Sequence, residues 1–405
     1  MEPVGRLKLA IVSTHPIQYY APVFRALTLS NSVSPRVFFT WSQSAEGALF
    51  DPGFGMRVSW DIPLRDGYDH VFVRNVAKQP GTGHFNGIQN PTLNREIADW
   101  GASAVLIYGW NLSSHLRALR HFKGRVPVLF RGDSTLLDPR NRIRSLARKI
   151  WLRWVYSHVD VAIAVGQNNR DYYTWCGLNA ARIAFAPHSV DTHRFRDGGG
   201  DDELRAQRWR SELGIPEHEV VFLFAAKFIP KKAPMLLLDA FLAMNSAAHL
   251  ILAGTGELEP MLRGRAAGSG NVHFLPFQNQ RDMPAVYRLG DVYVLPSRGP
   301  GETWGLALNE AMASARAVIS SSSAGGARDL VQRDVTGWIF NSGDAEDLTR
   351  VMQTALRHGR KGLLQIGATA QRASAGWSTE AAAEAIAAAA IDACNGGDPA
   401  NHAPV

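Results

Sequence analysis

Two glutamates separated by seven residues are the most informative candidates for chemistry in this chain. Glu302 and Glu310 lie in the segment 301–310, which reads GETWGLALNE. The apolar run 291–295 before it predicts a buried strand, and residues 306–315 after it predict a helix. We therefore expect Glu302 on a strand-to-helix loop and Glu310 inside the helix.

The predicted start of that helix is a candidate phosphate site. Backbone amides at Gly305, Leu306 and Ala307 would carry unsatisfied N–H groups at the positive end of the helix dipole. Such groups bind phosphates readily. One carboxylate could then face a sugar and the other a ribose diol, which indicates a nucleotide-sugar site. The alternative is two surface glutamates near a helix start, where acids are common.

Two lysines precede this segment. Lys227 follows the apolar run 220–225, and Lys232 lies in the loop before a helix expected to begin near Pro234. A lysine at the carboxyl end of a strand can reach phosphate oxygens as a point charge. The alternative is a solvated basic loop, and this is our interpretation of Lys231.

Other nucleotide-binding signatures are weak or missing. Gly254 and Gly256 follow the predicted strand 249–253, but a lone Gly-x-Gly is most often a tight turn. The chain has no Gly-x-Gly-x-x-Gly after its first strand and no P-loop pattern. These absences argue against a nicotinamide or flavin enzyme and against a P-loop nucleotidase.

Composition bounds the class of protein. The chain has 405 residues, of which 46% are hydrophobic and 20% charged, so we expect a globular protein of two or more domains. We find no run of about 18 apolar residues that could span a membrane, and no signal sequence. Cys176 and Cys394 give neither a disulfide framework nor zinc spacing, so we expect a cytoplasmic protein. The net charge of +7 favours anionic partners, but nucleic acid is not expected because no binding module is recognisable.

Alternating strands and helices predict an α/β protein with two doubly wound, Rossmann-like domains facing a central cleft. We expect a first domain over 1–196, a polar linker over 197–207, a second domain over 208–376, a helix over 377–395 and a disordered tail over 396–405. The predicted strands are 7–13, 35–40, 104–108, 126–131, 159–165, 220–225, 249–253, 272–274, 291–295, 317–320 and 337–340.

Together and in this order, these elements resemble the family-four retaining glycosyltransferases of the GT-B fold, over most of the second half of the chain. The resemblance implies an N-terminal acceptor-binding domain over 1–196 and a nucleotide-sugar-binding domain over 208–376. It also implies that the helix over 377–395 packs back on the first domain. Lys227 stands where that family usually has Arg, and Lys232 aligns with its Lys; the resemblance implies that both bind the donor diphosphate. Glu302 and Glu310 match the family's Glu-x(7)-Glu motif, which implies contacts with the transferred sugar and the ribose. The implied donor-binding loop holds Trp304, Gly305, Leu306 and Ala307, whereas Ala226, Ala233 and Ala315 stand where the family often has Gly, and Ala317 where it often has Pro.

The first half resembles a subgroup with a His-Pro-Ile-Gln-Tyr opening, here residues 15–19. The resemblance implies that this loop lines the cleft, with His15 near phosphate or acceptor hydroxyls and Gln18 and Tyr19 binding acceptor. A structural histidine beside a proline is an equal alternative. Asp133, after the strand 126–131, is the second candidate for the reaction centre, against a turn-capping role. Segments 50–55, 60–61 and 86–91 also match the subgroup, and we interpret them as core and turn residues.

The implied activity is retaining transfer of a sugar from a nucleotide-diphosphate donor to an acceptor hydroxyl, in bacterial surface-polysaccharide or lipid-linked glycan assembly. No metal or other cofactor is expected. The alternatives are a GT-B epimerase, a phosphorylase, or a sugar-nucleotide-binding protein without catalysis. A product assay without acceptor would separate an epimerase from a transferase.

A predicted basic helix over 141–157 suggests one further partner. Its apolar residues 143, 146, 147, 150 and 154 share one face of a helical wheel. A solvated basic face is the default interpretation, and contact with an anionic membrane is the alternative. The cations of the other face are Arg142, Arg144, Arg148, Lys149 and Arg153.

Overall fold

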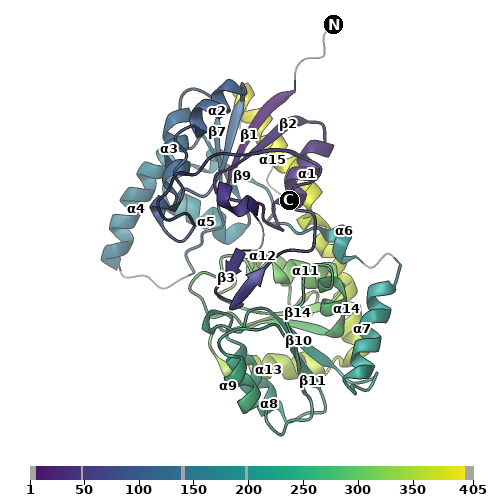
Figure 1. The fold of residues 1–405 in the computed structure, drawn as a ribbon. Coiled ribbons are helices and arrows are strands. Elements are labelled where there is room, and N and C mark those ends of the chain that lie inside the picture. Colours follow the sequence, from purple (N-terminus) through teal and green to yellow (C-terminus); the bar gives the residue numbers. More distant parts are fainter. Residues whose placement is uncertain (1–5, 47–48, 138–141, 197–198, 397–405) are drawn as a thin grey trace. The chain divides into compact units, whose positions relative to one another are not determined.

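The computed structural model describes residues 6–46, 49–137, 142–196 and 199–396. These residues form two compact units (Figure 1). The first unit comprises Met1–Gly47, Pro63–Ser189 and Thr379–Val405, and the second comprises Ala48–Ile62 and Val190–Ser378. Each unit is an α/β layer structure built on one parallel sheet, as the alternating pattern predicts.

The first sheet has seven parallel strands in the order β5-β2-β1-β6-β7-β8-β9. After β1, the chain adds β2 and β5 on one side of it. The chain then returns to place β6 on the other side of β1 and adds β7, β8 and β9 beyond β6. The topological switch point, where such sheets bind ligands, therefore lies between the carboxyl ends of β1 and β6. The strands are β1 (Leu7–Ser13), β2 (Val33–Phe39), β5 (Asp69–Phe72), β6 (Ala104–Tyr108), β7 (Val128–Arg131), β8 (Val161–Ala164) and β9 (Ile183–Phe185).

Helices cover both faces of this sheet. Leu9 and Ile11 of β1 belong to one buried cluster, and Ala10 and Val12 to another, because successive side chains of a strand point to opposite faces. The first cluster includes α1 (Ala21–Leu29) and the Ala-rich α15 (Thr379–Asn395), which pack on each other. The second cluster is built with α2 (Leu93–Asp99), α3 (Ser113–Phe122), α4 (Arg142–Ser157) and α5 (Gln167–Trp175).

The second sheet has six parallel strands in the order β12-β11-β10-β13-β14-β15, so its switch point lies between β10 and β13. Its strands are β10 (Val221–Ala225), β11 (His249–Ala253), β12 (Val272–Leu275), β13 (Val292–Leu295), β14 (Ala317–Ser321) and β15 (Gly337–Phe340). The flanking helices are α6 (Thr192–Phe195), α7 (Asp201–Glu212), α8 (Pro234–Met244), α9 (Glu259–Arg265), α10 (Met283–Leu289), α11 (Ala307–Ala313), α12 (Ala327–Leu330), α13 (Ala345–Leu356) and α14 (Gly359–Ala373).

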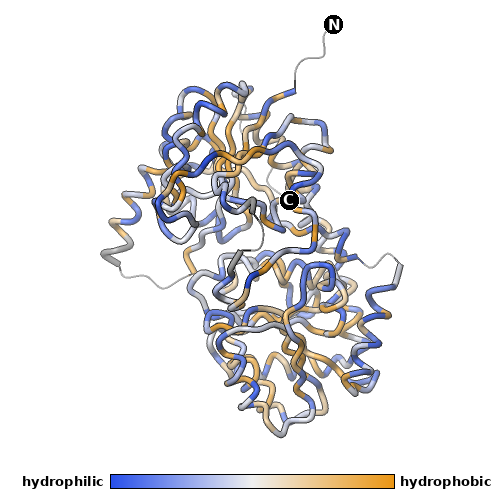
Figure 2. The backbone as a smooth tube through the Cα atoms, in the orientation of Figure 1, coloured by the Kyte–Doolittle hydropathy of each residue, from blue (hydrophilic) through white to orange (hydrophobic). Residues whose placement is uncertain are grey.

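Hydropathy follows these layers (Figure 2). The strands of the second sheet are largely apolar, and Phe222, Phe224 and Leu250 are fully buried in one cluster with α8 and α13. Continuous apolar strands are typical of parallel sheets covered on both faces. No helix in the described part of the chain combines the length and the hydrophobicity needed to span a bilayer.

The linker predicted at 197–207 is wrong from residue 201 onward, where α7 begins. This helix is an integral part of the second unit because Arg210 donates to Asp291 at 3.1 Å, and both side chains are buried. Asp291 also accepts from the backbone N–H of Val221, so α7 is fixed to the amino edge of the sheet. Its acidic first turn suits the positive end of the helix dipole.

A small antiparallel hairpin is also assigned differently from our sequence boundaries. Strands β3 (Leu49–Asp51) and β4 (Met56–Val58) lie within the predicted first domain, 1–196, but belong to the second unit. The reason is a set of contacts distant in sequence, which are described below. The predicted disordered tail, 396–405, lies outside the described residues except for Gly396.

Candidate functional site

The predicted donor-site residues of the second unit gather at its switch point. Lys227 follows β10, and Ser297 and Glu302 follow the neighbouring strand β13. Both strands end at the same edge of the parallel sheet. This is the edge at which open α/β sheets bind ligands.

Glu302 is buried, with 8% of its surface exposed, and is held by two donors. The Lys232 ammonium donates to its Oε2 atom at 2.6 Å, and the Ser297 hydroxyl donates to the same oxygen at 2.8 Å. Burial acts to raise the pKa of Glu302, but the Lys232 charge and these hydrogen bonds outweigh it, so the pKa lies below its ordinary value. Glu302 is therefore an oriented, ionised carboxylate at neutral pH and not a proton donor.

Lys232 reaches Glu302 from a short turn, the 3-10 helix η4 (Pro230–Lys232). Lys231 in the same turn donates to the carbonyl of Gly301 at 2.6 Å, and its own carbonyl accepts from the backbone N–H of Arg298 at 3.0 Å. Our interpretation of Lys231 as part of a solvated basic loop is therefore wrong. It ties the turn to the loop that carries Glu302.

Lys227 has a partner that the sequence analysis did not identify. Its ammonium lies 2.8 and 2.7 Å from the two carboxylate oxygens of Asp51, which follows from the placement of the β3–β4 hairpin in the second unit. The pair is partly open, with side chains 30% and 26% exposed. Asp51 lies in the segment 50–55, which we interpreted as core and turn residues, and only the three-dimensional structure brings it to Lys227.

Glu310 is buried in α11, where two residues from other helices approach its carboxylate. The Tyr287 hydroxyl of α10 donates to Oε2 at 2.6 Å, and a guanidinium nitrogen of Arg194, from α6, lies 4.0 Å from Oε1. Arg194 is itself held by Gln280, to which it donates at 2.6 and 2.9 Å. The carboxylate is thus fixed within the second unit by several elements.

The loop between the two glutamates is shaped by Trp304 and Gly305. The Trp304 side chain is 3% exposed and donates to Asn309 at 2.8 Å, so it packs inside the unit and supports the loop. The predicted role of Trp304 in donor binding stays a prediction. Gly305 has a φ of 93°, and a Cβ there would lie 2.6 Å from Leu295, so glycine is required.

The helix that follows is shorter than predicted, spanning Ala307–Ala313 instead of 306–315. It is preceded by Leu306 as N-cap, so the predicted phosphate-binding amides do lie at its start. Ala315 and Ala233, two positions where the resembled family often has Gly, have positive φ values of 58° and 50°. A left-handed alanine costs about 1–2 kcal/mol, which explains a glycine preference at these turns.

The Gly254-x-Gly256 pattern has a packing role. A Cβ on Gly254 would lie 2.1 Å from the carbonyl oxygen of Ala226, and one on Gly256 would lie 2.7 Å from that of Phe228. The Phe228 N–H donates to Thr255. This loop therefore supports the segment that carries Lys227.

In the first unit, the 15–19 loop follows β1 at that sheet's switch point. His15 lies 2.9 Å from the Thr14 hydroxyl, and its ring meets Trp41 edge-on at 5.3 Å. Burial lowers the pKa of His15 from 6.5 to about 4, so the ring is neutral at pH 7. His15 can exchange hydrogen bonds there but adds no positive charge. Gln18 and Tyr19 are half-buried in the same loop.

Asp133 follows β7 and lies in the electrostatic environment of His188, a residue that the sequence analysis missed. His188 follows β9 and is buried; burial and then Arg131 lower its pKa, while Asp133 opposes them. Arg131 donates to the carbonyls of Ala186 and Pro187 at 3.0 and 2.8 Å, which fixes the segment before His188. The signal that could have identified His188 is a polar residue shortly after a strand end, beyond Ala186 and Pro187, but β9 has only three residues and was not predicted.

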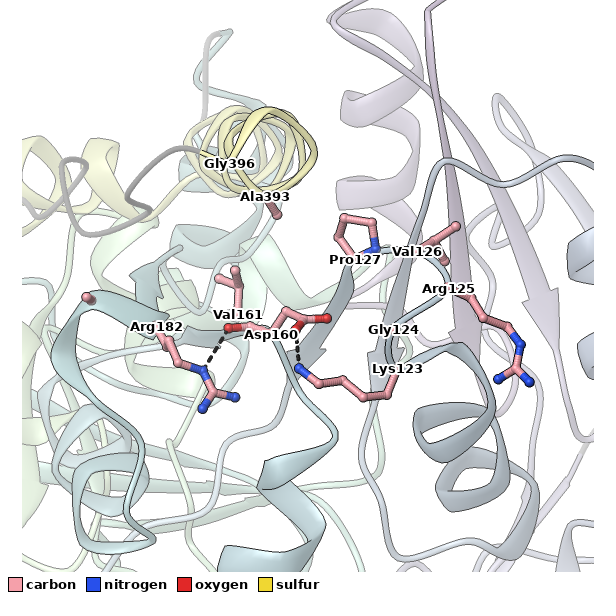
Figure 3. Close-up of a pocket in the computed structure, with 11 residues that line it drawn as sticks. Lys123, Gly124, Arg125, Val126, Pro127, Asp160, Val161, Arg182, Ala393 and Gly396 are labelled. Atoms are coloured by element: carbon pink, nitrogen blue, oxygen red, sulfur yellow. Dashed lines mark hydrogen bonds and ion pairs between the residues drawn. The ribbon is translucent and has the colours of Figure 1, made fainter.

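A hollow of about 670 Å³ occurs elsewhere in the first unit (Figure 3). Its lining includes Pro127, Val161 and Arg182, at or just before the amino ends of β7, β8 and β9. Lys123 and Asp160 pair across it. It therefore lies at the sheet edge opposite to the switch point. No group of side chains suited to a metal ion occurs among the residues that the structure describes.

Comparison with known proteins gives a consistent result. Residues 205–372 match the family model described as glycosyl transferases group 1. A D-inositol 3-phosphate glycosyltransferase of Geodermatophilus obscurus is 33% identical over 371 residues, covering 82% of this chain and 79% of that protein. A protein of the same description from Nocardia farcinica is 26% identical over 365 residues, covering 80% and 76%.

Solved structures share the fold at low sequence identity. HepE of Anabaena, in complex with UDP and glucose, has a TM-score of 0.66 and 18% identity, covering 94% of this chain and 98% of that chain. WaaG, described as a glycosyltransferase involved in lipopolysaccharide biosynthesis, has a TM-score of 0.65 and 14% identity, covering 96% and 100%. A glycosyltransferase of Rickettsia africae has a TM-score of 0.70 and 12% identity, covering 94% and 96%.

Proposed function

The chain belongs to the glycosyl transferases group 1 and its two Rossmann-like units have the GT-B fold, and from this premise we propose a retaining transferase that uses a nucleotide-diphosphate sugar. The proposal rests mainly on the part-buried Lys232–Glu302 pair, whose carboxylate is buried, at the second switch point. This pair places a cation and an oriented carboxylate beside each other, at the edge where the sheet binds ligands. Lys227 adds a second cation after the adjacent strand.

The proposed chemistry is breakage of the bond between the anomeric carbon and the diphosphate oxygen, with a new bond to an acceptor hydroxyl on the same face. The departing diphosphate gains negative charge, which Lys227 and Lys232 would stabilise. The acceptor proton would pass to a leaving phosphate oxygen. Glu302, being ionised, would position the sugar and stabilise positive charge at the anomeric carbon. Glu310 would bind the ribose.

Uridine diphosphate sugars are the first donors to test, because HepE of Anabaena is bound to UDP. We propose a cytoplasmic role in bacterial surface-polysaccharide or lipid-linked glycan assembly. A small phosphorylated cyclitol is a second acceptor class, favoured by the inositol 3-phosphate glycosyltransferases among the relatives. In the first unit, His15 and Asp133 are proposed as further catalytic residues, and Gln18 and Tyr19 are proposed to bind the acceptor. We include no metal or other cofactor in this mechanism.

A thermal-shift panel of nucleotide sugars tests the proposal. A donor present at 100 times its Kd adds about 2.7 kcal/mol to the free energy of unfolding of the unit that binds it. The stabilising sugar nucleotide is then incubated with each acceptor class, and the anomeric configuration of the product is read by NMR. Inversion would contradict the retaining mechanism, and a rearranged free sugar nucleotide formed without acceptor would favour an epimerase. Stabilisation by no nucleotide sugar would contradict the donor site.

We also propose that helix α4, whose default interpretation from the sequence is a solvated basic face, contacts an anionic membrane surface. The structure buries Leu152 and Val155 of this helix against the first sheet and leaves other apolar side chains outside. Residues 142–157 contain no acidic residue, so an anionic lipid surface matches their charge. The exposed apolar side chains are Leu146 (63% exposed), Ile150 (64%), Trp151 (44%) and Trp154 (39%).

We predict that the double substitution Leu146→Gln and Ile150→Gln weakens binding to anionic vesicles about tenfold or more, since two exposed aliphatic side chains would no longer enter the lipid interface. Co-sedimentation with vesicles containing phosphatidylglycerol measures this. The matched control is Leu29→Gln with Leu204→Gln, two residues 71% and 52% exposed on other helices. Equal binding of neutral and anionic vesicles, or equal losses in both double variants, would contradict the membrane contact.

A further inference from the structure

The segment 49–62, here called the strap, belongs to the second unit and contacts Lys227 of the candidate donor site. It contains β3 and β4 and is anchored to the loop that follows β12. Phe54 meets Phe277 edge-on at 4.8 Å, and Asn279 donates to the carbonyl of Ser59 at 2.8 Å. The backbone N–H of Arg281 donates to Asp61 at 3.1 Å. These contacts fix the strap on the carboxyl edge of the second sheet.

The anchored strap carries Asp51 to Lys227. Both carboxylate oxygens lie within hydrogen-bond distance of the ammonium, at 2.8 and 2.7 Å. Oδ1 also accepts from the backbone N–H groups of Gly53 and Phe54 at 2.9 and 3.2 Å, so the turn holds the carboxylate in place. The ammonium lies 4.8 Å from the centre of the Phe54 ring, a cation–π distance.

The Lys227 stem is also packed against the strap. A Cβ added at Gly53 would lie 2.6 Å from Cδ of Lys227, so the lysine crosses directly over this glycine. The strap therefore contributes a carboxylate, an aromatic face and a surface for the lysine stem. This arrangement specifically holds one cation of the candidate donor site.

We infer that Asp51 is an affinity-determining residue of the donor site, which competes with the diphosphate for the Lys227 ammonium. The inference rests on the proposed function, because it assumes that Lys227 binds diphosphate. An ammonium has only three donors, and a diphosphate oxygen at Lys227 would meet the Asp51 carboxylate as a like charge at close range. The diphosphate must therefore displace Asp51 or share the ammonium with it.

Lys232, the other lysine of the candidate donor site, has a more enclosed carboxylate partner than Lys227 has. Glu302 is more enclosed than Asp51, with side chains 7% and 26% exposed, and it has the additional Ser297 donor. The Asp51–Lys227 pair is the more open of the two and lies on an anchored but separate segment. An incoming diphosphate therefore breaks the Asp51–Lys227 pair at a smaller free-energy cost than the Lys232–Glu302 pair, because part-exposed ion pairs are weak. Asp51 thus lowers the affinity for donor and nucleotide-diphosphate product alike and favours product release.

The test is the substitution Asp51→Asn, measured by isothermal titration with UDP. Asparagine retains the Oδ1 acceptor for the turn at Gly53 but removes the charge. We expect the Kd for UDP to fall about two- to fivefold, the range set by a part-exposed ion pair. The matched control is Asp61→Asn, in the same strap but bonded to a backbone N–H and not to Lys227; its Kd is expected to stay within about 1.5-fold of the wild type.

A variant of Lys227 separates the inference about Asp51 from the proposed function. Lys227→Met should weaken UDP binding about tenfold, and Asp51→Asn added to it should produce no further tightening, because the competition requires the ammonium. If Lys227→Met binds UDP like the wild type, Lys227 is not a diphosphate ligand and that part of the proposed function is wrong. If Lys227→Met weakens binding but Asp51→Asn leaves the Kd unchanged or raises it, the inference about Asp51 is overturned and the donor site stands.

Discussion

Replacing Glu302 by glutamine is expected to lower kcat about 10²- to 10³-fold while changing the donor Kd less than about threefold, the scale found when one oriented electrostatic group is lost. Glutamine keeps an oxygen for the Ser297 hydroxyl but removes the negative charge that the proposed mechanism places beside the anomeric carbon. The charge matters most when positive charge develops in the transition state, so turnover should suffer more than binding. Steady-state kinetics and isothermal titration with the donor measure the two effects separately.

The control for Glu302 is Ser297→Ala, which removes the hydroxyl that donates to Glu302 and leaves the ion pair with Lys232. We expect it to lower kcat by much less than Glu302→Gln, because one neutral donor contributes about 0.5–1.5 kcal/mol. Thermal unfolding of both variants excludes loss of the folded enzyme as the cause. A Glu302→Gln enzyme with kcat within about threefold of the wild type would remove Glu302 from the reaction centre.

The central strands of both sheets could be predicted from the sequence, because strands buried on both faces are continuous apolar runs. The predicted runs 7–13, 104–108 and 249–253 agree with β1, β6 and β11 at both ends. The edge strands β5 and β9 of the first sheet were not predicted, because β9 has only three residues and β5 begins with the polar residues Asp69 and His70. Their apolar signal is too short to be distinguished from a loop.

The domain boundaries were less predictable, because long-range contacts decide them. Nothing local in the sequence indicates that Phe54 packs on Phe277 or that Asp51 pairs with Lys227. The polar composition of 197–207 suggested a linker, but the buried Arg210–Asp291 pair makes the following helix part of the second unit. Tertiary contacts therefore overrode composition at both positions.

In the candidate site, the grouping of residues could be predicted from the sequence, whereas their burial could not. Glu302 and Lys232 form an ion pair. Their residue types and their places in loops that follow predicted strands indicate this grouping from the sequence alone. Burial was harder to predict: the neutral state of His15 and the enclosed ring of Trp304 depend on neighbours that only the fold supplies. On α4, the helical wheel identified an apolar face but not that much of it would stay outside the core.

Replacing Glu310 by glutamine is expected to weaken UDP binding about 10- to 100-fold, because a buried carboxylate that accepts hydrogen bonds from a ribose diol contributes about 1.5–3 kcal/mol. Glutamine has nearly the same shape and still accepts from the Tyr287 hydroxyl, but it loses the charge and one acceptor oxygen. Isothermal titration with UDP measures the change in Kd. Turnover at saturating donor should change much less, since the ribose is distant from the bond that breaks.

Inorganic pyrophosphate provides the decisive comparison for Glu310. It has no ribose, so its Kd should be the same for the Glu310→Gln and wild-type proteins if the carboxylate binds the ribose diol. Tyr287→Phe is the structural control, because it removes the hydroxyl that donates to Glu310 and leaves the carboxylate charge. Equal weakening of UDP and pyrophosphate by Glu310→Gln would mean that Glu310 only shapes α11 and its surroundings. Selective weakening of UDP would assign the carboxylate to the uridine part of the ligand, which holds the ribose diol and which pyrophosphate lacks.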